Sequence, residues 1–202
     1  MIEDVWLEVG FGGGEHLIWQ AQQHPLAGLI GVEPYEGGVA KLLSRLALSG
    51  TAGLQPASMA RDHQVRPRWP RSQGENIRVY QGDARDVIEA LPDASLGRVF
   101  ILFPDPWPKT RHHKRRFIQM DMLDALARVM RPGAELRFAS DDAGYAAWTL
   151  ERIFAHSAFE WAANRVDDWK SRPADWPPTR YEEKALHGPP AFLLFQRTKS
   201  TP

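Results

Sequence analysis

The sequence predicts an α/β fold: a doubly wound, mostly parallel sheet with helices on both faces. Short apolar segments alternate with segments of helical periodicity from the N-terminus onward. One apolar segment, Gly97–Phe103, is apolar nearly throughout, as expected of a central strand that is buried on both faces. In such folds ligands bind at the carboxyl ends of the strands, so the residues there are the candidates for function.

The first half of the chain predicts a β-α-β-α opening, then a third strand and a short helix. The strands are short apolar runs, and the helices are longer segments with apolar residues three and four positions apart. In chain order the expected elements are strand Val5–Val9, helix Glu15–His24, strand Leu29–Glu33, helix 37–49, strand Asn76–Tyr80 and helix Arg85–Leu91.

The second half continues this alternation. An amphipathic helix is expected over Phe117–Met130 and is stopped by Pro132 and Gly133. The remaining expected elements are strand Glu135–Ala139, a helix beginning near Asp142, a helix beginning at Thr179 in a capping-box pattern, and a final strand over residues 191–197.

Composition favours one globular domain over residues 1–202, because 43% of the residues are hydrophobic and 25% are charged. Lys plus Arg equals Asp plus Glu at 25 each, so a polyanionic partner must be argued from local clusters of charge. The absence of cysteine excludes thiolate zinc sites and cysteine nucleophiles, and no metal site is predicted. Since no apolar run is long enough to span a membrane, we expect a cytoplasmic protein without a membrane partner.

Two proline-rich segments interrupt the alternation. Residues 53–74 have no periodicity and are interpreted as a mobile insertion. Residues 166–190 contain Trp169 and Trp176 and are interpreted as a lid on the substrate side. These tryptophans could stack on bases, although packing in the core is the commoner fate of tryptophan.

The first chemical motif is a glycine-rich turn between the first strand and the first helix, LEVGFGGGEHL. Gly10, Gly12 and Gly14 allow a tight turn and close approach of a ligand to the backbone. The nicotinamide fingerprint requires a further glycine where this chain has Glu15. Glu8 adds a carboxylate at the end of the strand, which suits a cationic ligand such as S-adenosyl-L-methionine.

Two more acids follow the next two predicted strands. Glu33 ends the second strand, 19 residues after Gly14, where nucleotide-binding folds place an acid on the ribose hydroxyls. Asp83 follows the third strand and could meet the adenine, although alone it would be interpreted as a helix cap. Acids after three successive strands favour a nucleotide-like cofactor.

The most unusual segment is FPDPWPKTRHHKRR, which follows the predicted central strand. Three alternating prolines restrict the backbone around Asp105 and Trp107, and a stiff loop can position a catalytic group. The basic residues after it would be a solvated helix face in most proteins. Their place beside the predicted cofactor crevice favours contacts with RNA phosphates.

These motifs resemble the bacterial tRNA (guanine-N7)-methyltransferases over Leu7–Arg197, and FPDPWPK followed by RHHKRR is the most specific element. The resemblance implies a Rossmann-like methyltransferase sheet of about seven strands. It also implies S-adenosyl-L-methionine as cofactor, tRNA as partner, and methylation of guanosine N7 in the variable loop.

Residue by residue, the resemblance implies a catalytic role for Asp105. The implied cofactor-binding residues are Glu8, Gly10, Gly12, Gly14, Glu33, Asp83 and Asp105. The implied substrate-binding residues are Lys109, Arg111, His112, His113, Lys114, Arg115, Arg116, Asp141, Thr179, Arg180, Tyr181 and Glu182. In the absence of the resemblance, Thr179 and Asp141 would be interpreted as helix caps. The chain departs from the family in lacking a basic segment before the first strand, and in its longer insertion at 53–74.

Two other functions are compatible with the sequence. A loop of similar type serves methyltransferases that act on exocyclic amines of RNA or protein, but Trp107 stands where that pattern has a second proline. The second alternative is an RNA-binding module with a vestigial cofactor pocket. The sequence indicates no obligatory protein partner and does not decide between a monomer and a homodimer.

Overall fold

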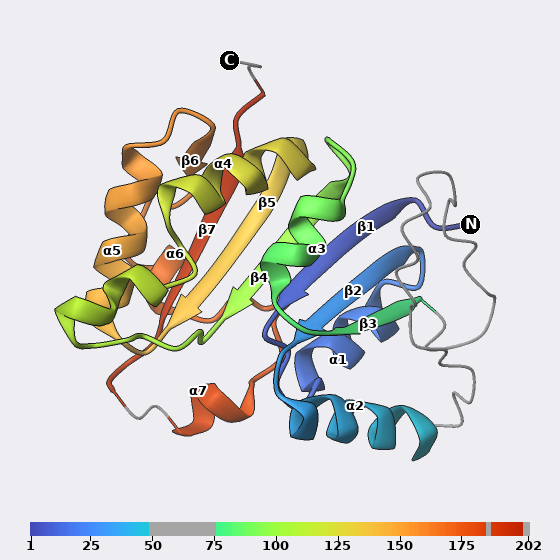
Figure 1. Cartoon of the computed structure of the whole chain (residues 1–202). Coiled ribbons are helices and arrows are strands. Elements are labelled where there is room, and N and C mark those ends of the chain that lie inside the picture. Colours follow the sequence, from blue (N-terminus) through green and yellow to red (C-terminus); the bar gives the residue numbers. More distant parts are fainter. Residues whose placement is uncertain (49–75, 185–186, 200–202) are drawn as a thin grey trace. The chain divides into compact units, whose positions relative to one another are not determined.

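The computed structural model describes residues 1–48, 76–184 and 187–199, except the side chains of Tyr181 and Lys184 (Figure 1). The chain divides into two compact units, residues 1–84 and 85–202, which are described separately. The insertion predicted at 53–74 lies outside the described residues, and the interpretation of residues 1–202 as one domain stays a prediction.

In its described residues, the first unit has three parallel strands in the order β3-β2-β1. Val9 of β1 is level with Val32 of β2, and Glu33 of β2 is level with Gln81 of β3, so the three carboxyl ends lie along one edge. The described elements are β1 (Asp4–Val9), α1 (Glu15–Gln23), β2 (Ala27–Glu33), α2 (Glu36–Leu48) and β3 (Ile77–Gln81). Each predicted element of this unit is confirmed to within two residues at either end.

Apolar side chains of the strands and helices form the core of the first unit. Leu7 and Leu29 from the strands, and Leu17 and Leu42 from the helices, are at most 1% exposed. Gly14, the residue before α1, has a φ of 78°, and a side chain there would overlap Leu42. Glycine is therefore required at this position both by its backbone conformation and by the close approach of α2.

The second unit contains four strands in the order β4-β5-β7-β6. β4 and β5 are parallel, whereas β7 is antiparallel to both of its neighbours. Figure 1 shows α7 beyond the arrowheads of β4 and β5. The elements are α3 (Ala84–Ala90), β4 (Leu96–Leu102), the 3₁₀ helix η1 (Thr110–Arg115), α4 (Met120–Val129), β5 (Met130–Ser140), α5 (Ala143–Phe154), β6 (Phe159–Trp161), α6 (Asp167–Lys170), α7 (Arg180–Lys184) and β7 (Ala191–Arg197).

The end of the helix predicted over Phe117–Met130 is confirmed to within one residue, although α4 starts at Met120. The strand starts earlier than predicted, because β5 begins at Met130, directly after the helix ends, and not at Glu135. The pairing with β4 shifts between Leu96–Met130 and Arg98–Glu135, so this part of β5 bulges. Gly133, with a φ of 82°, lies in the bulge, where a proline and a glycine are tolerated within a strand.

Three short elements, η1, β6 and α6, were not predicted. β6 has three residues and α6 has four, which is too short for either periodicity to show. None of the described helices has the length and apolar character needed to cross a bilayer.

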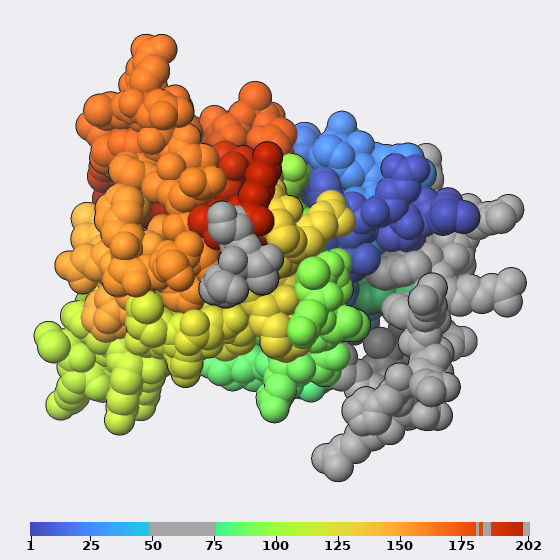
Figure 2. All heavy atoms as spheres, turned by 90° about the horizontal axis from the view of Figure 1, so that it is seen from above, coloured from blue at the N-terminus to red at the C-terminus, as the bar shows by residue number. Residues whose placement is uncertain are grey.

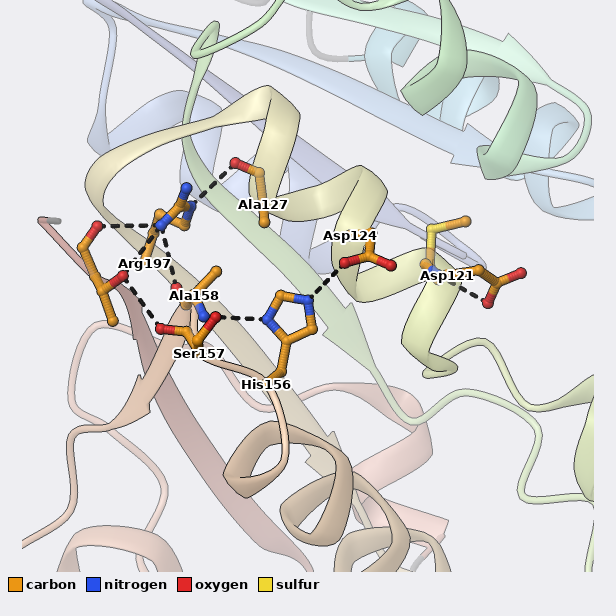
Figure 3. Close-up of polar contacts among 9 residues, drawn as sticks. Asp121, Asp124, Ala127, His156, Ser157, Ala158 and Arg197 are labelled. Carbon is orange, nitrogen blue, oxygen red and sulfur yellow. Dashed lines mark hydrogen bonds and ion pairs between the residues drawn. The ribbon is translucent and has the colours of Figure 1, made fainter. Parts of the chain in front are cut away.

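A polar joint ties α4, β6 and β7 together on the side of the sheet where β7 ends (Figure 3). Arg197 is 8% exposed and donates from Nε to the Ala127 carbonyl at 3.0 Å and from Nη1 to the Ala158 carbonyl at 3.5 Å. His156 accepts from the Ala158 amide and donates to Asp124 at 3.1 Å. Figure 2 shows the red end of β7 bordered by the orange segment that follows α5 and by the yellow start of β5.

Candidate functional site

The glycine-rich turn after β1 leaves room for a ligand beside the backbone. Gly10, Gly12 and Gly14 have φ values of 72°, 56° and 78°, all in the left-handed region that favours glycine. A Cβ atom built on Gly10 would meet nothing within 4 Å, so the space beside it is open. The residue before α1, Gly14, makes no side-chain capping hydrogen bond to the helix.

Glu33 is fixed at the end of β2 by the glycine-rich turn itself. Its side chain is 7% exposed. The Gly12 amide donates to Oε2 at 2.8 Å, and the Tyr35 amide donates to Oε1 at 2.9 Å. A carboxylate has about four acceptor positions, so both oxygens can accept further hydrogen bonds from hydroxyl groups of a ligand. Glu33 is therefore buried, oriented and still able to bind.

Glu8 is buried at the end of β1 and is paired with a histidine that the sequence did not single out. His16 Nδ1 of α1 lies 2.8 Å from Glu8 Oε2, and the two side chains are 3% and 4% exposed. Gln20, one turn later, places its amide nitrogen 3.2 Å from His16 Nε2. The spacing of four residues puts His16 and Gln20 on the buried face of α1, where they orient the Glu8 carboxylate.

Asp83 lies between β3 and α3 and is exposed. Because the three strands of the first unit end along one edge, Glu8, Glu33 and Asp83 follow that edge in the order of the strands. The structure thus places the three acids predicted to bind the cofactor along one edge of the first unit. Their contacts with a cofactor stay a prediction.

The proline loop of the second unit, residues 103–109, has a constrained backbone. Phe103 and Trp107 have φ values of 51° and 45°, a backbone conformation that residues other than glycine rarely adopt. Each such residue costs about 1–3 kcal/mol and persists only where its surroundings hold it. Asp105 lies between these two residues and is exposed. The loop therefore presents a carboxylate on a backbone that other contacts must fix.

Several contacts fix this loop. At its start, the Phe103 amide donates to the Ala139 carbonyl at 2.8 Å, which extends the pairing of β4 with β5. In its middle, Arg116 Nε donates to the Pro106 carbonyl at 2.8 Å. The Trp107 ring lies beneath the Arg115 guanidinium, with 4.8 Å between Cζ and the ring centroid.

The basic residues at the end of the loop and after it fall into three groups according to their burial. Most of their side chains lie on η1, a 3₁₀ helix whose turn of three residues distributes successive side chains around its axis. Arg116 alone is buried, at 3% exposed, and His112 and His113 are half-buried. The exposed members, here called the basic surface, are Lys109, Arg111, Lys114 and Arg115.

Asp141 and Asp142 follow β5, and the structure corrects the expected capping residue. Asp142, not Asp141, caps α5, since its Oδ1 accepts from the Tyr145 amide at 2.6 Å. Asp141 instead accepts from the His187 amide at 3.2 Å. Because β4 and β5 are parallel, Asp141 and the proline loop follow neighbouring strand ends.

The segment 166–190, predicted to be a lid, is anchored at its centre. Trp176 is 5% exposed and contacts Phe192 of β7, and Asp175 pairs with Arg137 of β5 at 2.7 Å. Trp176 therefore packs in the core, whereas Trp169 is half-buried.

The predicted cap at Thr179 is confirmed. Its Oγ1 accepts from the Glu182 amide at 3.1 Å at the start of α7. Arg180 is exposed, and the Tyr181 side chain lies outside the described part. A role for this segment as a lid stays a prediction.

The family described as "Putative methyltransferase" matches residues 3–190. A tRNA (guanine-N(7)-)-methyltransferase of Rhodospirillum rubrum is 48% identical over 198 residues, which are 97% of this chain and 69% of the relative. The same name is carried by a Caulobacter vibrioides protein that is 46% identical over 194 residues, 96% of this chain and 75% of the relative. The chain belongs to the tRNA (guanine-N(7)-)-methyltransferase family.

Solved structures give the fold of this family member independently of sequence. TrmN from Thermus thermophilus superimposes with a TM-score of 0.61 at 13% identity, over 97% of this chain and 44% of that one. A precorrin-6y C5,15-methyltransferase from Geobacter metallireducens gives 0.57 at 13% identity, over 98% and 81%. The predicted fold class, a doubly wound, mostly parallel Rossmann-like methyltransferase sheet, is confirmed.

Proposed function

We propose that this member of the tRNA (guanine-N(7)-)-methyltransferase family transfers the methyl group of S-adenosyl-L-methionine to N7 of a guanosine in the variable loop of tRNA. The observation that carries the proposal is its identity of 42–48% to relatives of that name, over nearly the whole chain. The exposed Asp105, on a constrained loop followed by a basic surface, supports the same chemistry. We place the reaction in the cytoplasm.

The residues of the glycine-rich turn fit the cofactor. S-adenosyl-L-methionine, when bound, supplies an electrophilic methyl group on a cationic sulfonium. Glu8, buried and oriented by His16, is suited to the positively charged methionine end. Glu33 has acceptor positions left for the ribose hydroxyls, and open space beside Gly10 admits a ligand to the backbone. We assign the adenine end to Asp83, with Asp105 as a further contact.

Asp105 is assigned an orienting and electrostatic role. Guanine N7 carries a free lone pair on the major-groove edge of the base, so no side chain has to remove a proton before methyl transfer. Asp105 can accept hydrogen bonds from donor groups of the guanine and can stabilise the positive charge that develops on the ring. Its constrained loop supplies the orientation that such a reaction needs.

RNA binding is assigned to the basic surface, with Arg180 of α7 as an additional cation. Four exposed cations of η1 and the residue before it can neutralise phosphates without requiring a particular base sequence. His112 and His113, which are half-buried, and Asp141, Thr179, Tyr181 and Glu182 are assigned to the nucleotide or its flanking backbone. Folded tRNA must release the target guanine from its stack, and half-buried aromatic side chains are suited to receive it.

Incubation of the protein with labelled S-adenosyl-L-methionine and unmodified tRNA tests the proposal. The methylated nucleoside is then identified by digestion and mass spectrometry, and its position is mapped in the tRNA. We expect 7-methylguanosine at a single position in the variable loop. Label on an exocyclic amine of the RNA, or the absence of any transfer despite tRNA binding, would refute it.

A further inference from the structure

Arg116 differs from the other cations near the proline loop because its guanidinium group points into the protein. It follows η1 as the residue that caps its C-terminal end, and its side chain is 3% exposed. Among the residues that the structure describes, it pairs with no carboxylate. Instead, Nε donates to the Pro106 carbonyl at 2.8 Å, and Nη1 lies 3.4 Å from the Gly144 carbonyl.

Two aromatic rings complete the surroundings of this guanidinium. Its Cζ lies 4.9 Å from the ring centroid of Tyr145 and 5.0 Å from that of Trp148, both on α5. The Trp148 indole donates to the Ile118 carbonyl at 2.8 Å, and the Tyr145 hydroxyl accepts from the Phe117 amide at 2.8 Å. The ring faces and the carbonyl groups compensate the buried positive charge.

The two carbonyl groups belong to the two segments that carry the candidate-site acids of the second unit: the proline loop with Asp105, and the start of α5 after Asp141. Pro106 follows Asp105 directly, and Gly144 lies in the first turn of α5, two residues after the cap Asp142. Prolines have no amide hydrogen, so the alternating prolines leave the loop few backbone donors of its own. Its carbonyl groups are the remaining points of attachment, and Arg116 uses the one next to Asp105.

From these contacts we infer that Arg116 is a positioning residue, which clamps the Asp105 loop to the start of α5. It sets the direction of the Asp105 carboxylate through the Pro106 carbonyl, and it does not serve as a phosphate contact. Lysine cannot replace it, because a guanidinium donates in two directions from a fixed plane whereas an ammonium group is a point charge on a flexible stem. The kinetic consequence rests on the proposed function, but the clamp itself does not.

Arg116→Lys tests the inference, with Arg197→Lys as the matched control. Arg197 is the other arginine of the second unit described as buried and donating to carbonyl groups of distant segments. We expect Arg116→Lys to lower the single-turnover rate at saturating cofactor and tRNA by about 100-fold, the cost of a misplacement of about 1 Å. The affinity for tRNA and its dependence on salt should stay at the parent's values. Arg197→Lys should leave the rate unchanged.

A second measurement does not depend on activity. In protein labelled with fluorotryptophan, Trp107→Phe identifies the Trp107 resonance. Arg116→Lys should shift or broaden that resonance because the loop loses its attachment, and Arg197→Lys should not. Partial unfolding is separated from mispositioning because it lowers the amplitude of the single turnover, whereas mispositioning lowers its rate constant.

Two results would overturn the inference. One is a parental rate with an unmoved Trp107 resonance. The other is a salt slope that falls by about 0.7–0.9 in Arg116→Gln, which removes the charge, because that loss would identify Arg116 as a phosphate contact. If Arg116→Lys does not fold, Tyr145→Phe releases the amides of residues 117 and 118 and so loosens the backbone that carries the guanidinium. It should also lower the rate, and a parental rate would contradict the clamp. A parent protein that transfers no methyl group would refute the proposed function instead, and the fluorine measurement would still test the clamp.

Discussion

Arg116 and Arg197 use the same chemistry at two places in the second unit. Both are almost fully buried, and both donate from Nε to a backbone carbonyl of a distant segment. Arg197 joins α4 to the start of β6, and the two distant carbonyl groups that it contacts, those of Ala127 and Ala158, lie within or beside regular structure (Figure 3). Arg116 instead holds Pro106, in a loop with two residues of unfavourable φ around an exposed carboxylate.

The comparison shows that burial and hydrogen bonding do not by themselves distinguish a structural arginine from one that positions a functional group. The difference lies in what the arginine holds. Regular elements such as α4 have backbone hydrogen bonds of their own, so Arg197 adds stability to a geometry that already exists. The proline loop has few backbone donors for such bonds, so its geometry depends on side-chain contacts such as that of Arg116. Substitutions in the two regions should therefore affect different quantities.

The largest expected effect is that of Asp105→Asn, which keeps the size of the side chain and removes its charge. If Asp105 stabilises the charge that develops on the guanine, the saturated single-turnover rate should fall by about 100- to 1000-fold, comparable to the loss of one oxyanion-hole donor. Stability and tRNA binding should be close to the parent's, because Asp105 is exposed. Single-turnover kinetics at saturating cofactor and tRNA measure this directly.

Asp124→Asn is the matched control in the other region. Asp124 is also exposed, and it pairs with His156 beside the Arg197 joint. The same change of charge there should leave the rate at the parent's value. A near-parental rate for Asp105→Asn would show that the charge of Asp105 is dispensable, and equal losses in both variants would show that the effect is not specific to Asp105.

Arg197→Ala should produce the largest loss of stability and no loss of rate. Removing the guanidinium leaves the Ala127 and Ala158 carbonyls without this donor, which costs about 1–3 kcal/mol of the free energy of unfolding. Urea denaturation measures that free energy, and single-turnover kinetics on the folded fraction measure the rate. A rate reduced as strongly as in Arg116→Lys would mean that the two regions do not differ as described.

Much of the fold could be predicted, because the parallel strands are short apolar runs between helices of clear periodicity. The early start of β5 could not, because Pro132 and Gly133 are uncommon within strands, and here they lie in a bulge that only the register with β4 reveals. β6 could not be predicted because its three residues form a strand only by pairing with β7. Long-range pairing is absent from local sequence patterns.

The candidate site was predicted as a set of residues but not as a set of contacts. Glu8 and Glu33 were recognised by their place at strand ends, whereas His16, which orients Glu8, resembles any histidine on a helix. Arg115 and Arg116 are identical neighbours in a run of charges. At the end of η1 the Arg116 side chain points inward, whereas Arg115 lies over Trp107. The sequence alone does not distinguish these two environments.

A smaller effect is expected on the basic surface. If Arg111 and Lys114 neutralise one phosphate each, the double replacement by alanine should reduce the slope of log affinity against log salt by about 1.4–1.8. Lys41→Ala, on the exposed side of α2, is the control and should not change the slope. Binding titrations of tRNA at several salt concentrations supply the slopes. An unchanged slope in the double variant would show that Arg111 and Lys114 lie on a solvated helix surface and contact no phosphate.

The smallest expected effect concerns pH dependence. It compares the turn at residues 164–165, which the Asp168 carboxylate holds, with the proline loop, which the Arg116 guanidinium holds. Asp168 is exposed and accepts from the Asn164 amide at 2.9 Å and the Arg165 amide at 2.8 Å. These hydrogen bonds lower the pKa of Asp168 from its ordinary value of 3.8. Because the pKa is lower in the folded state, the local stabilisation is present above about pH 4 and is lost as the pH falls through the lowered pKa.

Hydrogen exchange measured against pH, and corrected for the intrinsic exchange rate, should therefore show the Asn164 and Arg165 amides losing protection only in acid. Asp168→Asn should remove this dependence on pH. The Phe117 amide beside Arg116 is the internal comparison, because it donates to the Tyr145 hydroxyl, whose pKa is raised by burial. That phenol stays neutral from acid to neutral pH, so the protection of Phe117 should not change. Parallel loss of protection at all three amides would indicate general acid unfolding and would remove this distinction between the two kinds of loop.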